Sequence, residues 1–187
     1  MENKSNPLIS QALLYGLYYA LVSIILSLVM WMVNFIPTSI GGSMLMLLVT
    51  IVIAFVLLYY FTKKYRDDSL GGYITFGKAF VFAFLVVVFS TLITAVYNYI
   101  FNAFIDPDYL ERVMNTTVTS MEERLARGGM SADQIDSIVG KMEQRMSLSP
   151  LKSSLKSIPG GIIFGTIVAL ITSAIVKKSQ EVFPENK

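Results

Sequence analysis

The sequence predicts an all-α integral membrane protein: a bundle of four transmembrane helices, with an extramembrane two-helix hairpin between spans three and four. Hydrophobic residues make up 54% of the chain and charged residues 15%, whereas soluble proteins carry about 25% charged residues. The hydrophobic residues also gather in charge-free runs that reach the roughly 20 residues needed to cross a bilayer. Because these runs are continuously apolar and do not alternate as barrel strands do, they favour helices.

The first two spans share one charge-free run, from Ser5 to Thr62. This run is too long for a single crossing and exceeds the 7–15 apolar residues of a signal peptide. Its break is Pro37–Gly42, which combines a proline with two glycines and therefore favours a turn. We expect the first span at about 9–35 and the second at about 43–62.

Two further charge-free runs predict the third and fourth spans. They are Ala79–Ile105 and Ser157–Val176, each with lysine just outside one or both of its ends. The chain then divides into spans one to three at 1–105, an outer hairpin and linker at 106–156, and span four with a tail at 157–187.

The lysines and arginines near the span ends predict the orientation, since such residues are enriched on the cytoplasmic side. Four crossings place both termini and the 63–78 loop on one side, and this side carries Lys4, Lys63, Lys64, Arg66, Lys78, Lys177, Lys178 and Lys187. In the 106–156 segment on the other side, acidic residues outnumber basic ones. The pattern predicts a multi-pass protein of the cell inner (plasma) membrane with both termini cytoplasmic.

The segment after span three carries the signals of a helix start. Asp106 is expected to cap a helix whose first position is Pro107, where the missing amide hydrogen costs nothing. Asp108 suits the positive end of the helix dipole, and capping explains the Asp106 and Asp108 pair more simply than acid–base catalysis or cation binding. The helix is expected to continue to Arg127.

A second helix is expected after a glycine stop. Gly128 and Gly129 end the first helix, and Ser131 with Gln134 forms a capping box for a helix that reaches Met146. Both helices carry an apolar stripe at helical spacing. The stripes are Leu110, Val113, Thr117, Met121 and Leu125 on the first helix and Ile135, Ile138, Val139, Met142 and Met146 on the second. The facing stripes predict a two-helix hairpin.

Two stretches resemble a known family. They are GGYITFGKAFVFAFL, at Gly71–Leu85, and YNYIFNAFIDPDYLE, at Tyr97–Glu111. They resemble a bacterial family of four-span membrane proteins known as domain of unknown function 4199, and the order of spans is similar over nearly the whole chain. The resemblance implies the fold and the membrane, and it implies no activity, cofactor or site residue.

Span four contains small residues at intervals of four, which favour close approach of another helix backbone. They are Gly161, Gly165, Ala169 and Ser173. The partner helix is either a neighbouring span, which is the default expectation, or a second copy of the protein.

Span three carries a polar face toward its outer end. Its members, at steps of three or four residues, are Thr91, Thr94, Asn98 and Asn102. Such side chains hydrogen-bond between helices in membranes, with Asn34 as a candidate partner here, or they line a hydrated path. We expect the first role, and keep the second as an alternative.

The composition sets bounds on function. The chain has no histidine and no cysteine, so the usual general base near neutral pH and thiolate chemistry are absent. A net charge of +2 is too small to suggest nucleic acid. We therefore expect no enzyme activity, no cofactor and no metal site. The first hypothesis is an accessory membrane protein that binds a protein partner or forms a homo-oligomer, and the alternative is a channel or transporter component with a path along span three.

Overall fold

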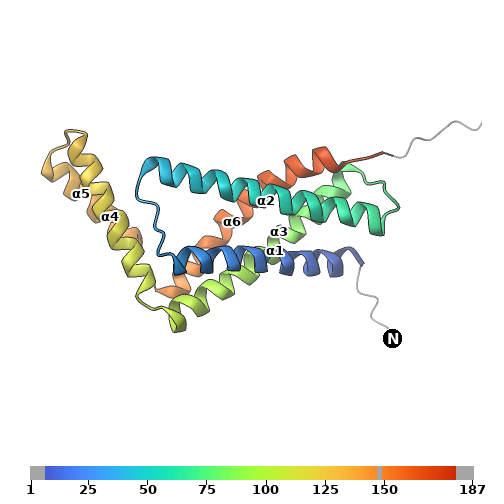
Figure 1. The fold of residues 1–187 in the computed structure, drawn as a ribbon, viewed down its shortest axis with the longest axis horizontal. Coiled ribbons are helices and arrows are strands. Elements are labelled where there is room, and N and C mark those ends of the chain that lie inside the picture. The colour runs from blue at the N-terminus through green and yellow to red at the C-terminus, as the bar shows by residue number, and fades with distance from the viewer. Residues whose placement is uncertain (1–6, 147–148, 180–187) are drawn as a thin grey trace, which may run out of the picture. The chain divides into compact units, whose positions relative to one another are not determined.

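The structure is a computed structural model that describes residues 7–146 and 149–179. Figure 1 labels its helices in chain order: α1 (Pro7–Met32), α2 (Ile40–Ser69), α3 (Phe76–Ile100), a π-helical turn η1 (Phe101–Ile105), α4 (Tyr109–Arg127), α5 (Ala132–Met146) and α6 (Pro150–Val176). Four segments are long and apolar enough to cross a bilayer: α1, α2, α3 with η1, and α6. This confirms the predicted all-α class with four spans.

The break between the first two spans lies slightly earlier than predicted. α1 ends at Met32, and the chain turns at Asn34, which adopts a positive φ of 50°. Ser39 then caps α2 by accepting the Gly42 amide hydrogen at 2.9 Å. The glycines that were expected in the turn therefore lie in the first turn of α2, because the serine before them supplies the cap.

The last helix begins earlier than predicted, at Pro150 and not at 157. Pro150 occupies the first helical position, where its missing N–H costs no bond, and the Ser153 amide bonds to the Ser149 carbonyl at 2.9 Å. Pro159 then lies inside the helix. A proline there leaves the carbonyl four residues earlier without its helical partner.

The described residues fall into two compact units. The first holds those of Met1–Ser23, Thr50–Ile93 and Pro159–Lys187, and the second holds those of Ile24–Val49 and Thr94–Ile158. Each long helix therefore contributes to both units.

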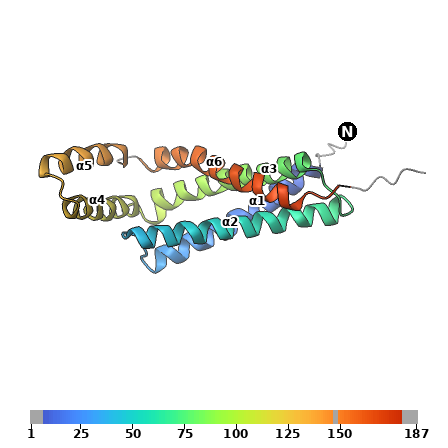
Figure 2. The same cartoon turned by 90° about the horizontal axis from the view of Figure 1, so that it is seen from above.

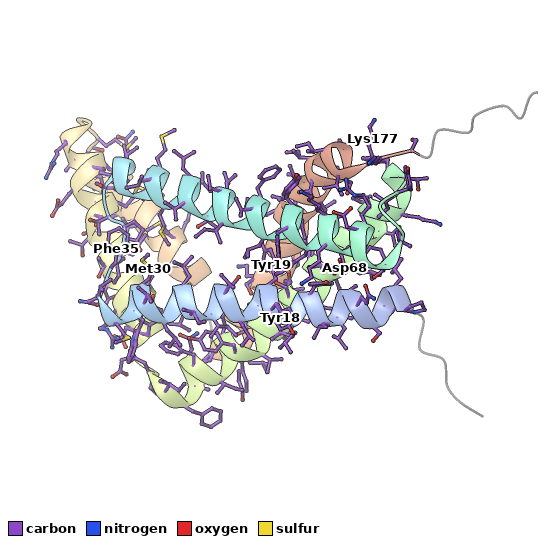
Figure 3. All side chains as sticks on the ribbon, turned by 45° about the vertical axis from the view of Figure 1, so that its right-hand side comes forward. Tyr18, Tyr19, Met30, Phe35, Asp68 and Lys177 are labelled. Atoms are coloured by element: carbon purple, nitrogen blue, oxygen red, sulfur yellow. The ribbon has the colours of Figure 1, made fainter. Side chains whose placement is uncertain are left out.

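The core of the first unit contains a cluster of aromatic rings. Phe82 is fully buried and stacks on Tyr65, with ring centroids 4.0 Å apart and planes 4° from parallel. Tyr15 packs against Phe82 and Phe61, with centroids 5.9 and 5.1 Å away. Tyr18 and Tyr19 are adjacent on α1 but lie on different sides of the helix (Figure 3), so Tyr19 packs on this core while Tyr18 is 45% exposed.

The central turn and the ends of both hairpin helices, at Arg127 and Met146, match the prediction. α4 and α5 lie side by side (Figure 2) and contact each other. Gly129, with φ of 80°, ends α4, and the Met130 amide bonds back to the Leu125 carbonyl at 3.2 Å. The Ser131 amide donates to the Gln134 side chain at 3.2 Å, which is one half of the predicted capping box.

The start of this hairpin was predicted wrongly. α4 begins at Tyr109, and its N-cap Asp108 makes no side-chain capping bond. Asp106 follows the π-helical turn and accepts hydrogen bonds from other side chains. A carboxylate beside an arginine and an indole N–H gains charge-assisted hydrogen bonds there, which replace the expected cap.

Candidate functional site

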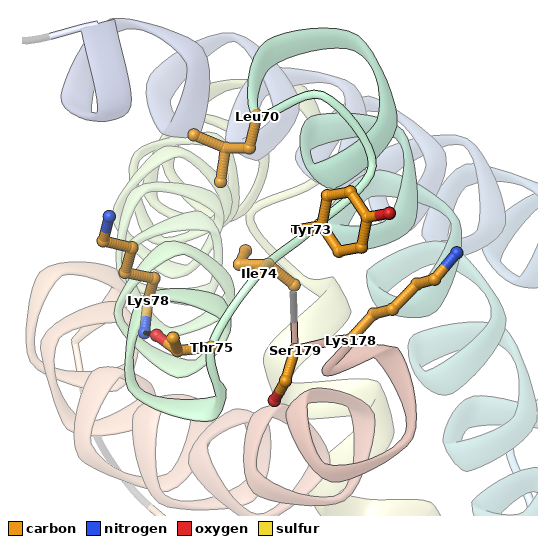
Figure 4. A pocket seen from close by; sticks show the side chains of 7 residues that line it. All are labelled: Leu70, Tyr73, Ile74, Thr75, Lys78, Lys178 and Ser179. Carbon is orange, nitrogen blue, oxygen red and sulfur yellow. Dashed lines mark hydrogen bonds between the residues drawn. The ribbon is translucent and has the colours of Figure 1, made fainter. Parts of the chain in front are cut away.

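The first unit contains a cavity of about 420 Å³, which Figure 4 shows from close by. It lies where α2 ends, α3 begins and the chain leaves α6. Its lining combines apolar, hydroxyl and ammonium groups: Leu70, Tyr73, Ile74, Thr75, Lys78, Lys178 and Ser179. We call this the Lys78–Lys178 pocket.

Local sequence explains how the walls form. Gly71 and Gly72 adopt φ values of 65° and 87°, which reverse the chain after α2. Thr75 caps α3, with its hydroxyl 3.4 Å from the Lys78 amide. Ile74 and Lys178 exchange two backbone hydrogen bonds of 3.0 and 2.9 Å in an antiparallel bridge. This bridge joins segments about a hundred positions apart and fixes the backbone of Lys178 relative to Ile74.

The electrostatics of the pocket are positive. The Lys178 ammonium lies 5.3 Å from the centroid of the Tyr73 ring. Among the described residues of this unit, neither Lys78 nor Lys178 forms an ion pair, and the Asp67 carboxylate is paired with Arg66 at 2.7 Å. Lys178 attracts Asp67 only at longer range, so it keeps much of its positive charge for a ligand. Arg66 also donates to the Val176 carbonyl at 3.0 Å, which ties the end of α2 to the end of α6.

The second unit contains a polar cluster around Asp106. Its carboxylate accepts the Trp31 indole N–H at 2.8 Å and two hydrogen bonds from the Arg112 guanidinium, one of them at 3.1 Å. The Arg112 guanidinium, followed by the Trp31 indole, holds the pKa of the Asp106 carboxyl below its usual range. The cluster connects the end of α1 to the start of α4.

Aromatic rings surround this cluster. Phe101, in the π-helical turn, meets the rings of Trp31 and Tyr109 nearly at right angles, with centroids 5.5 and 5.7 Å away. Edge-to-face contacts of this kind add to the stability that ring burial provides. The sequence did not show that Trp31, Asp106 and Arg112 form a group. No regular spacing relates them, and the sequence suggested only that all three lie near the same face of the membrane.

The small-residue series of α6 packs against α3 in the first unit. A Cβ added to Gly165 would collide with the Val87 side chain, and one added to Gly161 would lie 3.0 Å from Thr91 Cγ2. Ala169 and Ser173 are fully buried. The helix that approaches Gly161 and Gly165 is therefore a neighbouring span of the same chain.

A second small-residue series, on α1, was missed in the sequence. Ala12, Gly16 and Ala20 are buried at intervals of four residues. A Cβ on Gly16 would lie 2.8 Å from Phe89 Cβ and 3.1 Å from the Val86 carbonyl oxygen. The same spacing rule that identified the α6 series would have found this one. Helix α3 is thus approached closely by both α1 and α6.

The predicted polar face of span three divides between the two units. Thr91 faces Gly161 in the first, while Thr94, Asn98 and Asn102 belong to the second. The buried Asn102 amide donates to the Asn98 carbonyl at 2.7 Å, and its carbonyl oxygen has no partner among the described residues. Asn34 lies exposed in the turn after α1.

The hairpin stripes are only partly buried. Val118 and Val139 are 7% exposed, and Val118 was not assigned to a stripe. The other described stripe members are half-buried except for Ile138, which is 38% exposed. The Met146 side chain lies outside the described residues. The most buried stripe position of α5, Val139, was therefore predicted, whereas the most buried position of α4 is Val118, one residue after the predicted Thr117.

Within the described ranges, no group of three or more carboxylates comes together in a way that could hold a metal ion. Comparison with known proteins gives one family: the model described as "Protein of unknown function (DUF4199)" matches residues 14–178. No curated protein and no solved structure matches the chain. The family match covers most of α1, all of the other three apolar helices and the hairpin before α6. The chain is therefore a multi-pass membrane protein, and it belongs to the DUF4199 family.

Proposed function

We propose that this chain is a non-enzymatic accessory protein of the cell inner (plasma) membrane, with cytoplasmic termini, whose outer hairpin binds a protein partner. The lysine bias at the span ends supports the orientation. The sequence has no histidine and no cysteine, so the usual general base near neutral pH and the thiolate nucleophile are both absent, which supports a non-enzymatic role.

A groove along α4 supports partner binding by the hairpin. In the second unit, a cavity of about 380 Å³ is lined by Thr38, Ser39, Ile40, Ser120, Glu123, Arg124 and Arg127. A smaller cavity of about 100 Å³ shares Thr38, Ser120 and Arg124 with it and adds Pro37 and Met121. The two cavities form one groove between the turn after α1 and the outer face of α4.

The charges of the groove indicate its occupant. Arg127 pairs with Glu123 at 3.3 Å, which leaves Arg124 as excess positive charge beside the hydroxyls of Ser39 and Ser120. Arginine recognises carboxylates through paired hydrogen bonds, and hydroxyl groups satisfy backbone carbonyls. The partner is therefore a protein that inserts an acidic, extended segment into this groove.

Crosslinking in cells tests this role. A photoreactive residue at Ser120 should form a crosslink to a defined protein, and Arg124→Glu should reduce this crosslink at least tenfold by placing like charges together. Lys141→Glu makes the same charge change on the exposed surface of α5 and should leave the crosslink intact. Equal loss in both variants, or a crosslink indifferent to Arg124, would contradict partner binding in the groove.

Transport activity distinguishes the accessory role from that of a channel or transporter component. The accessory role predicts that liposomes containing only this protein have the same permeability to ions and small solutes as empty liposomes. A flux that increases with protein content would contradict it.

A further inference from the structure

We propose that the Lys78–Lys178 pocket is a binding site for a phosphate-bearing anion, supplied either by an anionic phospholipid headgroup or by a soluble phosphate. This site lies in the first unit and does not depend on the role proposed for the hairpin.

The pocket lies at the depth of the lipid headgroups. Lys78 directly precedes the charge-free run of α3, and Lys178 follows the charge-free run of α6 by two residues. Basic residues at these positions lie at the boundary between hydrocarbon and headgroups, where lipid phosphates also lie. The apolar Leu70 and buried Ile74 complete a lining that suits a molecule with an anionic end and an apolar end.

The polar side chains around the cavity are hydrogen-bond donors that suit an anion. In Figure 4, Lys78 and Lys178 lie on opposite sides of Ile74, with Tyr73 beside Lys178 and the hydroxyls of Thr75 and Ser179 below. Two ammonium groups and three hydroxyl groups supply hydrogen-bond donors for the oxygens of a phosphate. The flexible lysine stems allow both ammonium groups to turn toward one anion.

The backbone adds to this field. Helix α3 begins at Phe76, so the positive end of its dipole lies beside Thr75 and Lys78. Thr75 already accepts the Lys78 amide hydrogen and keeps its own O–H for a ligand. The lysines, the hydroxyl groups and the helix terminus therefore all favour a negatively charged ligand.

The cavity size is compatible with such a ligand. At about 420 Å³ it falls within the range of about 300–1,000 Å³ typical of small-molecule sites. The antiparallel bridge between Ile74 and Lys178 holds its two walls together, so the site is formed before a ligand arrives.

Ligand-dependent stabilisation of the purified full-length protein in neutral detergent provides the test. The probes are phosphatidylglycerol, phosphatidylcholine, inorganic phosphate and glycerol phosphate, and the readout is the Tm together with bound lipid counted by native mass spectrometry. The double variant Lys78→Gln, Lys178→Gln is compared with Lys63→Gln, Lys64→Gln, which removes two exposed charges from the same end of the first unit. Single variants replace either double variant that fails to accumulate.

The proposal predicts that at least one phosphate-bearing probe raises the Tm of the unchanged protein and of the Lys63, Lys64 variant. The Lys78, Lys178 variant should need at least tenfold more of that probe, since each lysine near an anionic surface contributes about fivefold in affinity. An effect of phosphatidylglycerol alone identifies a lipid headgroup, and an effect of inorganic or glycerol phosphate identifies a soluble ligand. If both double variants respond alike, the lysines act only through general surface charge, and the proposal is wrong. If phosphatidylcholine acts as strongly as phosphatidylglycerol, the stabilisation does not depend on a net anionic ligand, and the proposal is also wrong.

Discussion

Trp31 donates its indole N–H to Asp106, a residue 75 positions later in the chain. Each residue taken alone has a simpler explanation, because tryptophan is common at membrane interfaces and aspartate before a proline is common at a helix start. Both explanations rest on local preferences. The contact depends on where α1 ends relative to the π-helical turn, which no spacing along the chain encodes.

The pH response of Trp31 fluorescence tests this contact. The pKa of Asp106 is lowered in the folded protein, first by Arg112 and then by Trp31. The stabilisation is therefore fully present above the unfolded value of about 3.9 and is lost as the pH falls through the lower folded value. Trp31 is the only tryptophan, so its emission in detergent should change with a midpoint below about pH 3.9.

Asp106→Asn is the control for this titration. It keeps an oxygen that can accept the indole N–H but has no carboxyl to protonate. Its emission should therefore lack the transition that the unchanged protein shows below about pH 3.9. A transition at the same pH in both proteins would show that Asp106 is not the group that titrates.

The glycines of α6 allow a matched test of close packing. Gly165→Ala places a methyl group against Val87, whereas Gly160 has no atom within 4 Å of an added Cβ. Overpacking of this kind typically costs about 1–3 kcal/mol, while alanine at an open helical position is neutral or stabilising. Thermal unfolding in detergent should therefore show a lower Tm for Gly165→Ala and an unchanged or higher one for Gly160→Ala. Equal Tm values would argue against the α3–α6 contact.

At the scale of elements, the hairpin was the part most fully predicted from the sequence. Its central turn uses local devices, the Gly128–Gly129 stop and the Ser131–Gln134 box, whose effect does not depend on distant residues. The start of α6 was missed because the span was predicted from the charge-free run that begins at Ser157, whereas the helix extends back past Lys156 and Lys152 to Pro150. Val118 was missed because the stripe was drawn through Thr117, one position away.

Burial within the hairpin predicts which substitutions open it. Val118→Asp or Val139→Asp places a charge at the α4–α5 contact, and burying an unpaired carboxylate costs several kcal/mol. Thr119→Asp and Ser137→Asp add the same charge at neighbouring exposed positions. Limited proteolysis of the purified protein should show faster cleavage between Asp106 and Pro150 in the first two variants only. Similar cleavage in all four would mean that α4 and α5 do not stabilise each other.

At the scale of the whole molecule, charge-free runs determine how many times the chain crosses the membrane. This property belongs to the composition of long segments, so it was predictable from the sequence alone. The Lys78–Lys178 pocket was not predictable in this way, because its walls come from segments far apart in the sequence. The bridge between Ile74 and Lys178 brings these segments together. The sequence showed lysines at span ends but not which of them share a cavity.

We propose that both termini of this four-span chain are cytoplasmic, and cysteine labelling tests the number of crossings and this orientation together. The sequence contains no cysteine, so single cysteines can be introduced at Gly41, Ser69, Ser137 and Ser179, all of which are exposed. In intact cells, a membrane-impermeant thiol reagent should label the cysteines at Gly41 and Ser137, and label those at Ser69 and Ser179 only after the membrane is permeabilised. Labelling of Gly41 and Ser69 from the same side would contradict four crossings, and labelling of Ser69 and Ser179 alone in intact cells would contradict the orientation.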